Sequence, residues 1–203
     1  MSEPIIADEF CPFAAELRAA FDAHFADPYA MNMQAHGVWN YWYVPGKYTY
    51  LRSAPSRVLG DDLAQRFLAS LRDWALRHTG LVPVSPLLSL YVVGCHQALH
   101  NDAANGRLGF VYSLTNWRER KFDGGETLLL KQGEATGPAG RTELFDLIEP
   151  LFNRLLLFDD CRPHGVATVA GPMDPRQGRV VLHGHLVEQG VQVLEGKPDP
   201  ALR

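Results

Sequence analysis

The sequence predicts an α+β fold that is mainly β, in which helices pack on a barrel or sandwich of strands. Two helical segments come first, and many short strands separated by turns follow Pro86. The chain has 203 residues, of which 46% are hydrophobic and 21% charged. This composition is typical of one globular domain with a sizeable core, so we expect a single domain over residues 1–203.

Two segments have the apolar periodicity of amphipathic helices. The first runs from Pro12 to about Phe25. The second is GDDLAQRFLASLRDWALRHTG, residues 60–80, where Asp61 or Asp62 can cap the start and Gly80 ends the helix. The apolar positions are Phe13, Leu17, Phe21 and Phe25 in the first helix, and Leu63, Phe67, Leu71 and Trp74 in the second.

The segment between these helices, MNMQAHGVWNYWYVPGKYTYLRSAPSRVLG, is expected to form short strands and loops. It is rich in aromatic residues and is interrupted by Pro45, Gly46 and Pro55. Its aromatic side chains either form a lid or substrate wall, or belong to a barrel-edge strand packed on the helices. They are Trp39, Tyr41, Trp42, Tyr43, Tyr48 and Tyr50.

After Pro86 the pattern changes to strands. Glycine-rich turns separate them, at Gly106, at Gly124 and Gly125, at 137–140 and in GPMDPRQG. The expected strands are residues 88–94, 107–115, 125–131, 154–159, 164–170 and 179–187.

Charge and hydropathy argue against several classes of protein. A net charge of -4 and a pI near 6.0 give no basic surplus for binding nucleic acid. No apolar run approaches the roughly 20 residues of a membrane span, and the N-terminus MSEPIIADEFCPF lacks the features of a secretory signal. Cys11, Cys95 and Cys161 are odd in number and widely spaced, which favours reduced thiols. We expect a cytoplasmic protein.

The triplet HND, residues 100–102, is the first candidate for a metal site. Side chains two apart on a strand share a face, so His100 and Asp102 could reach one point in space. His164, at the start of a β-branched run, is a candidate third ligand. Two histidines and one carboxylate are the facial triad of non-heme Fe(II) oxygenases.

Arg179, at the head of the stretch RVVLHGHL, is a candidate anchor for an anion. With period 2, Val181, His183 and His185 share its face of the strand. A guanidinium in this position could hold the carboxylate of an anionic cosubstrate in a bidentate pair. The two histidines are expected to orient or pack rather than to bind metal.

The order of these motifs resembles the prolyl-hydroxylase-like branch of the Fe(II)- and 2-oxoglutarate-dependent dioxygenases. Tyr91 and Gly94 in YVVG precede HND, and Arg107 leads into FVYSLTNW. DGGETLLL, IEPLFNRLLLF, PHGVATV and RVVLHGHL follow in order. The resemblance implies a double-stranded β-helix, a jelly-roll or cupin-like barrel, at 87–187. Residues 1–86 would support it and 188–203 would form a tail.

The resemblance also implies a function and roles for individual residues. His100, Asp102 and His164 would bind Fe(II), Arg179 would hold the far carboxylate of 2-oxoglutarate, and Tyr91 would donate a hydrogen bond to it. With O2, the enzyme would hydroxylate a C–H bond and release succinate and CO2. The implied substrate is an amino-acid side chain, free or within a peptide, with proline first, or a natural-product intermediate. Arg52, Arg118 and Arg120 are candidates to meet a substrate carboxylate, against the default of a solvated charge.

Several departures from the family pattern keep alternatives open. Val181 and His185 stand where the family often has a serine or threonine and a tryptophan, and Arg176 competes with Arg179 as anchor. Arg179 is favoured because it opens the strand, whereas Arg176 lies in a turn. The alternatives are a cupin-like metal-binding barrel that works without 2-oxoglutarate and a non-catalytic interaction domain. The oligomeric state stays open.

Overall fold

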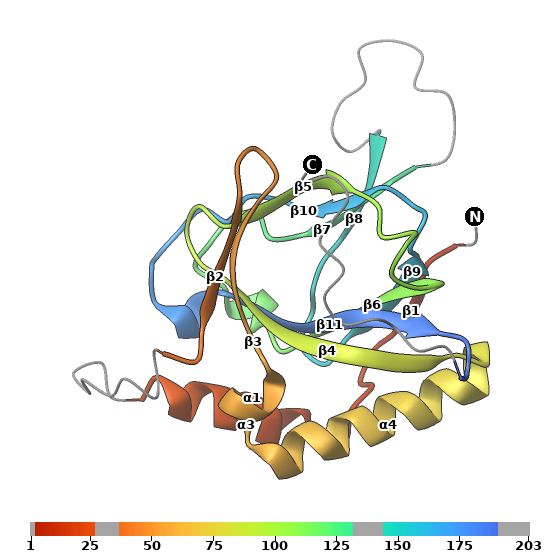
Figure 1. Cartoon of the computed structure of the whole chain (residues 1–203). Helices are drawn as coiled ribbons and strands as arrows, with labels where there is room; N and C mark the ends of the chain where they lie inside the picture. The colour runs from red at the N-terminus through yellow and green to blue at the C-terminus, as the bar shows by residue number, and fades with distance from the viewer. Residues whose placement is uncertain (1–2, 27–36, 132–143, 191–203) are drawn as a thin grey trace.

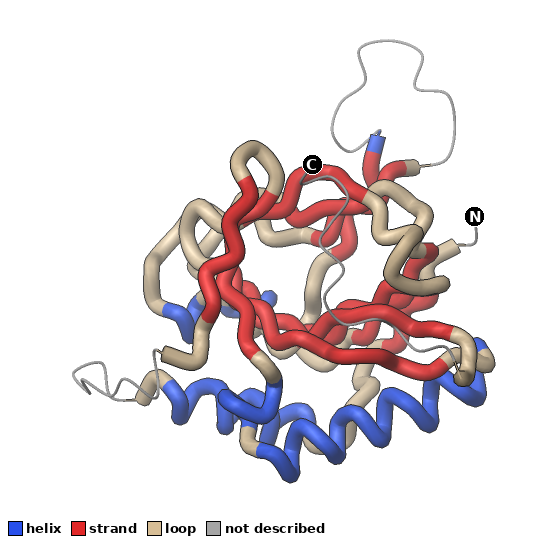
Figure 2. Tube along the Cα trace, in the orientation of Figure 1, coloured by secondary structure: helices blue, strands red, loops and turns tan. Residues whose placement is uncertain are grey.

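The strands form one strongly curled sheet that folds into two facing layers (Figures 1 and 2). In this computed structural model, residues 3–26, 37–131 and 144–190 are described. The lower layer contains, in spatial order, β1 (Ile5–Ala7), β9 (Leu155–Asp159), β6 (Leu108–Ser113), β11 (Arg179–Val187), β4 (Val82–Tyr91) and β3 (Tyr48–Ser53). The upper layer contains β5 (His96–His100), β10 (His164–Val166), β7 (Thr127–Leu130) and β8 (Phe145–Ile148).

Strand β3 joins the two layers, because it pairs with β4 on one side and with β5 on the other. Strand β2 (Asn40–Val44) pairs with β3 from Tyr48 to Arg52 and forms a hairpin with it. The named pairs are all antiparallel. This arrangement confirms the predicted mainly β barrel of the double-stranded β-helix type.

The helices α1 (Ala14–His24), α3 (Pro55–Leu59) and α4 (Asp61–Thr79) lie beneath the lower layer (Figure 1). The second predicted helix matches α4 and ends, as predicted, at Gly80, whose positive φ of 73° suits glycine. The predicted aspartate cap is wrong, because Gly60 is the N-cap residue and no side chain caps the helix. Asp61 and Asp62 instead lie in the first turn, where the helix dipole favours negative charge.

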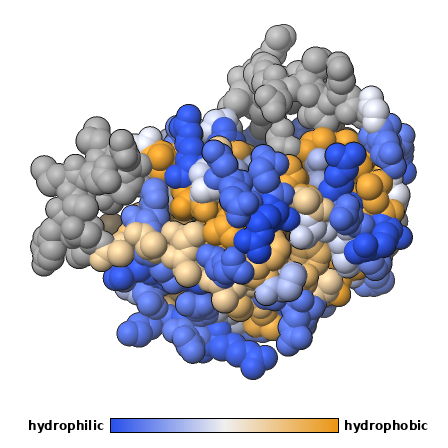
Figure 3. Space-filling view, turned by 90° about the horizontal axis from the view of Figure 1, so that it is seen from below, coloured by the Kyte–Doolittle hydropathy of each residue, from blue (hydrophilic) through white to orange (hydrophobic). Residues whose placement is uncertain are grey.

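The main hydrophobic core lies between the helices and the lower layer. Phe67 and Leu71 of α4 are buried, as are Leu88, Leu90 and Leu182 on β4 and β11. The outer face of the helices mixes hydrophilic and hydrophobic residues (Figure 3). Among the described helices, none has the length and apolar character that crossing a membrane requires.

Several short elements differ from the sequence prediction. Strands β1 and β8 were not predicted, since three or four apolar residues give too weak a periodicity. Pro55 was interpreted as a break but occupies the first turn of α3, a position that proline favours. The strand predicted at 164–170 ends at Val166, and the predicted turn at 137–140 lies outside the described residues.

The register of the lower layer determines which side chains face the barrel interior. Arg179 lies opposite Tyr91, and Val181 lies opposite Ser89. Ser89 in turn lies opposite Arg52 on β3. Directly opposed residues project from the same face of a sheet, so these five side chains line the interior side of the layer.

Candidate active site

The structure brings His100, Asp102 and His164 together at the upper layer. His100 ends β5 and His164 begins β10, and the two residues are direct partners in the ladder, with ring centres 4.4 Å apart. Asp102 lies two residues beyond the end of β5, so the two-residue spacing does not act along a strand as predicted. Its backbone N–H donates to the Asp160 carbonyl at 2.8 Å, which directs the loop back toward the histidines.

Three donor atoms converge at this point. Asp102 Oδ2 lies 3.7 Å from His100 Nε2 and 3.4 Å from His164 Nε2. His100 Nδ1 lies 2.8 Å from the Ala98 carbonyl oxygen, and His164 Nδ1 lies 2.9 Å from that of Arg162. A carbonyl only accepts, so each Nδ1 carries a proton and each Nε2 is the nitrogen directed toward Asp102. This donor set fits a divalent metal ion.

The charge state of Asp102 suits the same role. Burial alone would raise the pKa of its carboxyl group, but the imidazoles of His164 and His100 beside it outweigh burial and lower that pKa to about 2. Asp102 is therefore ionised near neutral pH, as a metal ligand must be.

Arg179 begins β11 and lies inside the barrel, only 1% exposed. Its Cζ lies 4.7 Å from the centre of the Tyr91 ring, and its Nη2 donates to Thr127 Oγ1 at 3.1 Å. Its Nε has no hydrogen-bond partner within the described part of the chain. Burial lowers the pKa of this guanidinium and raises that of the Tyr91 phenol. A buried cation with a free N–H is suited to hold an anion.

A comparison with protein-family models matches residues 87–186 to the 2OG-Fe(II) oxygenase superfamily. The chain belongs to this superfamily. It is therefore a 2-oxoglutarate-dependent iron oxygenase, with Fe(II), 2-oxoglutarate and O2 as its cofactors and cosubstrates. The match spans about half of the chain and includes the convergent donor atoms and Arg179.

Solved structures with the same fold cover nearly the whole oxygenase. A prolyl-4-hydroxylase from Pseudomonas putida has a TM-score of 0.64 and 17% identity, covering 92% of each chain. A prolyl hydroxylase from Trichoplax adhaerens, in complex with a hypoxia inducible factor peptide fragment, has a TM-score of 0.61 and 17% identity over 89% of this chain and 81% of that one. The epimerase SnoN from nogalamycin biosynthesis has a TM-score of 0.60 and 15% identity, over 91% and 78%. No curated protein matches the sequence.

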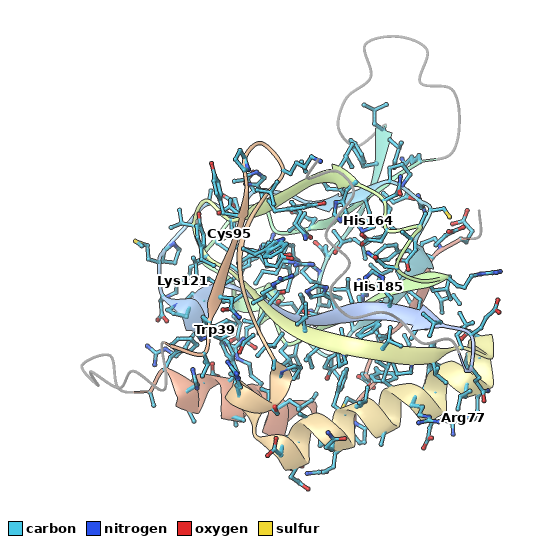
Figure 4. The ribbon with its side chains drawn as sticks, viewed as in Figure 1. Trp39, Arg77, Cys95, Lys121, His164 and His185 are labelled. Atoms are coloured by element: carbon cyan, nitrogen blue, oxygen red, sulfur yellow. The ribbon has the colours of Figure 1, made fainter. Side chains whose placement is uncertain are left out.

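A second polar group, which the sequence did not reveal, adjoins the first. Asp102, Asp160 and His185 also offer donor atoms within 4.8 Å of one another. Asp160 is fully buried, and its Oδ2 lies 3.0 Å from His185 Nδ1. A Cβ on Gly106 or Gly109 would come within 2.8 Å of this carboxylate, so both glycines make room for it. Figure 4 shows His164 and His185 on facing layers.

The pair formed by Asp160 and His185 holds the imidazole in one orientation. Burial raises the pKa of Asp160. For His185, burial would lower the pKa, but the hydrogen bond to Asp160 outweighs it and raises that pKa. Carboxylate contacts of this kind fix a histidine ring and its tautomer.

His183 also faces the interior, as its spacing from Arg179 predicts. Its Nε2 lies 2.7 Å from Ser89 Oγ. Burial lowers the pKa of His183 to about 3, so the ring is neutral near pH 7. The neutral His183 ring thus packs within the barrel and orients the Ser89 hydroxyl, and it adds no charge there.

The depressed pKa of His183 predicts a specific pH dependence of stability. The unfolded chain, with a histidine pKa near 6.5, binds a proton that the folded protein excludes, so stability falls as pH drops from 6.5 toward 3. This histidine contributes a slope of up to about 1.4 kcal/mol per pH unit. His183→Asn should flatten the curve by that slope in urea unfolding of the metal-free protein. Parallel curves for both proteins would contradict the prediction.

Arg176 lies outside the barrel interior, in the short 3-10 helix η2 (Pro175–Gln177). Its Nη2 lies 3.1 Å from Asp174 Oδ2, and its backbone carbonyl accepts from Arg18 Nη2 at 2.6 Å. The competing anchor is thus already paired with a carboxylate.

Proposed function

We propose that this oxygenase hydroxylates a C–H bond of an amino-acid-derived small molecule or of a residue in a peptide, with succinate and CO2 as coproducts. The observation that carries the proposal is the convergence of His100 Nε2, His164 Nε2 and Asp102 Oδ2, with both imidazole tautomers fixed by backbone carbonyls. Similarity in fold to two prolyl hydroxylases supports hydroxylation and an amino-acid type of substrate. A cytoplasmic location is part of the proposal.

His100, Asp102 and His164 are the proposed ligands of the iron. When bound, the iron supplies the redox chemistry by which O2 and 2-oxoglutarate oxidise the substrate. The protein contributes three ligands on one side of the site, which leaves the opposite side for cosubstrate and oxygen. Two aromatic rings pack against the proposed ligands and limit their motion. The Phe158 ring centre lies 4.6 Å from that of His164, and the Tyr48 ring centre lies 5.1 Å from that of His100.

Arg179 is the proposed anchor for the far carboxylate of 2-oxoglutarate, with Tyr91 beside it. In the upper layer, Leu129 lies opposite His164, and Thr127 lies opposite Val166. Two residues of a strand span about 7 Å. The contact of Arg179 with Thr127 therefore lies about 7 Å from His164, measured along the strand direction. A five-carbon dicarboxylate has a suitable length to connect the two points.

The first test needs no substrate. The metal-free protein is loaded with Fe(II) and then 2-oxoglutarate without oxygen, and the weak visible charge-transfer band of the chelate is recorded. We expect the band in the natural protein and its loss in His164→Ala. Tight metal binding without a band would instead favour the cupin-like alternative.

Thr127 is a candidate second anchor that the sequence did not indicate. Val181 cannot supply the hydroxyl that the family often has at this position, whereas the buried Thr127 hydroxyl touches Arg179 from the opposite layer. We predict that Thr127→Val weakens 2-oxoglutarate binding about 10-fold, the effect of one buried hydrogen bond. Titration of the chelate band measures this affinity, with Thr168→Val, at an exposed position, as control. Equal affinities for both variants would exclude the role.

A further inference from the structure

We infer that the substrate of this oxygenase carries a free carboxylate, which Arg52 binds inside the barrel. This inference rests on the proposed function, since it names the substrate class for the same site. It favours a free amino acid, or the C-terminal residue of a peptide, over a residue within a peptide chain.

Arg52 projects from the interior face of β3. It lies opposite Ser89, whose hydroxyl contacts His183, and two residues from Tyr50, which stacks on Tyr91 with ring centres 5.0 Å apart. The Arg52 guanidinium and the Gln97 side chain both lie beside the Tyr50 hydroxyl. Asp102 is close enough for its charge to raise the pKa of that hydroxyl. The guanidinium therefore projects from the same face of the lower layer as Ser89 and Tyr91, the face that lies inside the barrel.

The guanidinium is held in a defined plane. Its Cζ lies 3.5 Å from the centre of the Trp42 ring, on the neighbouring strand β2. Stacking covers one face of the guanidinium and does not itself occupy the N–H edges. Such an edge binds a carboxylate through two parallel hydrogen bonds, and prior fixation lowers the entropy that binding costs.

The charged side chains on the interior faces of the two layers explain why an anion is needed beside Arg52. Asp102 faces two imidazoles and Asp160 is paired with His185, while Arg179 is the proposed partner of 2-oxoglutarate. Arg52 has no carboxylate within ion-pair distance in the described ranges. A partly buried cation without a counter-charge is costly. A substrate carboxylate would supply the missing charge, which an internal peptide residue cannot do through its backbone.

The other two arginines considered from the sequence do not share this position. Arg118 is exposed in the short 3-10 helix η1 (Trp117–Glu119). Arg120 packs on the Trp117 ring, with its Cζ 3.8 Å from the ring centre, and its Nη1 donates to the Trp117 carbonyl. Arg118 therefore offers a matched control.

The test follows ligand binding at Trp42. With Zn(II) in place of iron and with 2-oxoglutarate bound, the indole N–H signal of Trp42, assigned by means of Trp42→Phe, is recorded by NMR. The titrants are the free L-amino acids, their C-terminal amides and dipeptides that end in the same residues. We expect saturable shifts with at least one carboxylate and at least 10-fold weaker binding of its amide. The dipeptides separate a free amino acid from a peptide C-terminus.

Variants link the response to Arg52. Arg52→Gln should weaken carboxylate binding at least 10-fold, Arg52→Lys should weaken it less, and Arg118→Gln should not change it. The Fe(II) and 2-oxoglutarate band checks that each variant is folded. Equal binding of acid and amide, no response to any carboxylate, or unchanged binding in Arg52→Gln would each overturn the inference while the band persists. Absence of the band in the natural protein would overturn the proposed function, and this inference with it.

Discussion

Asp102→Ala is expected to abolish succinate formation from 2-oxoglutarate and to weaken Fe(II) binding by at least about 100-fold. Changes just outside a metal's ligand shell already cost 10- to 100-fold in affinity, so loss of the carboxylate ligand should reach or exceed that range. The variant should still fold, because the side chain is 24% exposed and the backbone N–H retains its bond to Asp160. Fe(II) affinity by chelator competition, together with succinate assays, measures the effect.

Two further substitutions determine which donor group holds the iron, since Asp102 belongs to both groups. His164→Ala should cause losses similar to those of Asp102→Ala. His185→Ala should leave Fe(II) affinity within about 100-fold of the natural value, because we place it outside the ligand set. The reverse ranking would move the metal to the group of Asp102, Asp160 and His185. Unchanged succinate formation in Asp102→Ala would contradict the assignment altogether.

Sequence reasoning selected His100, Asp102, His164 and Arg179 as candidates because each is marked by a local signal. A short spacing marks HND, and the strands that begin at His164 and Arg179 start with β-branched runs. The predicted basis for the HND pair, two side chains on one face of a strand, is wrong because Asp102 lies beyond the end of β5. The Asp160 carbonyl accepts from its backbone N–H and directs the loop. The residue types were predictable, whereas the path of the loop depends on a contact between distant segments.

The residues that the sequence did not reveal are those placed by register between distant strands. Thr127 meets Arg179 only because the sheet curls until β7 faces β11, a separation of 52 residues in the chain. Asp160 meets His185 in the same way, and Gly106, which was interpreted as a turn, in fact leaves space for that carboxylate. The pattern of a single sequence indicates periodicity and turns. It does not indicate how strongly the sheet curls, and that curl determines which distant residues come into contact.

Arg179→Ala is expected to weaken 2-oxoglutarate binding by at least about 30-fold, while Arg176→Ala changes it by less than about fivefold. Arg179 is buried, contacts Thr127 and retains a free Nε–H, so a carboxylate bound there would be shielded from water. Arg176 is half-exposed and already paired with Asp174, and exposed ion pairs contribute little. Titration of the Fe(II) chelate band with 2-oxoglutarate measures both affinities.

A cosubstrate analogue separates loss of the anchor from general damage to the barrel. 2-Oxopentanoate keeps the metal-chelating end of 2-oxoglutarate but lacks the far carboxylate, so Arg179→Ala should hardly change its binding. Arg179→Lys, which keeps a charge but loses the planar fork, should fall between Arg179→Ala and the natural protein for 2-oxoglutarate. Arg176→Ala could instead cause the larger loss, and only for the dicarboxylate. In that case the anchor lies in η2, and the far carboxylate does not reach Arg179 inside the barrel.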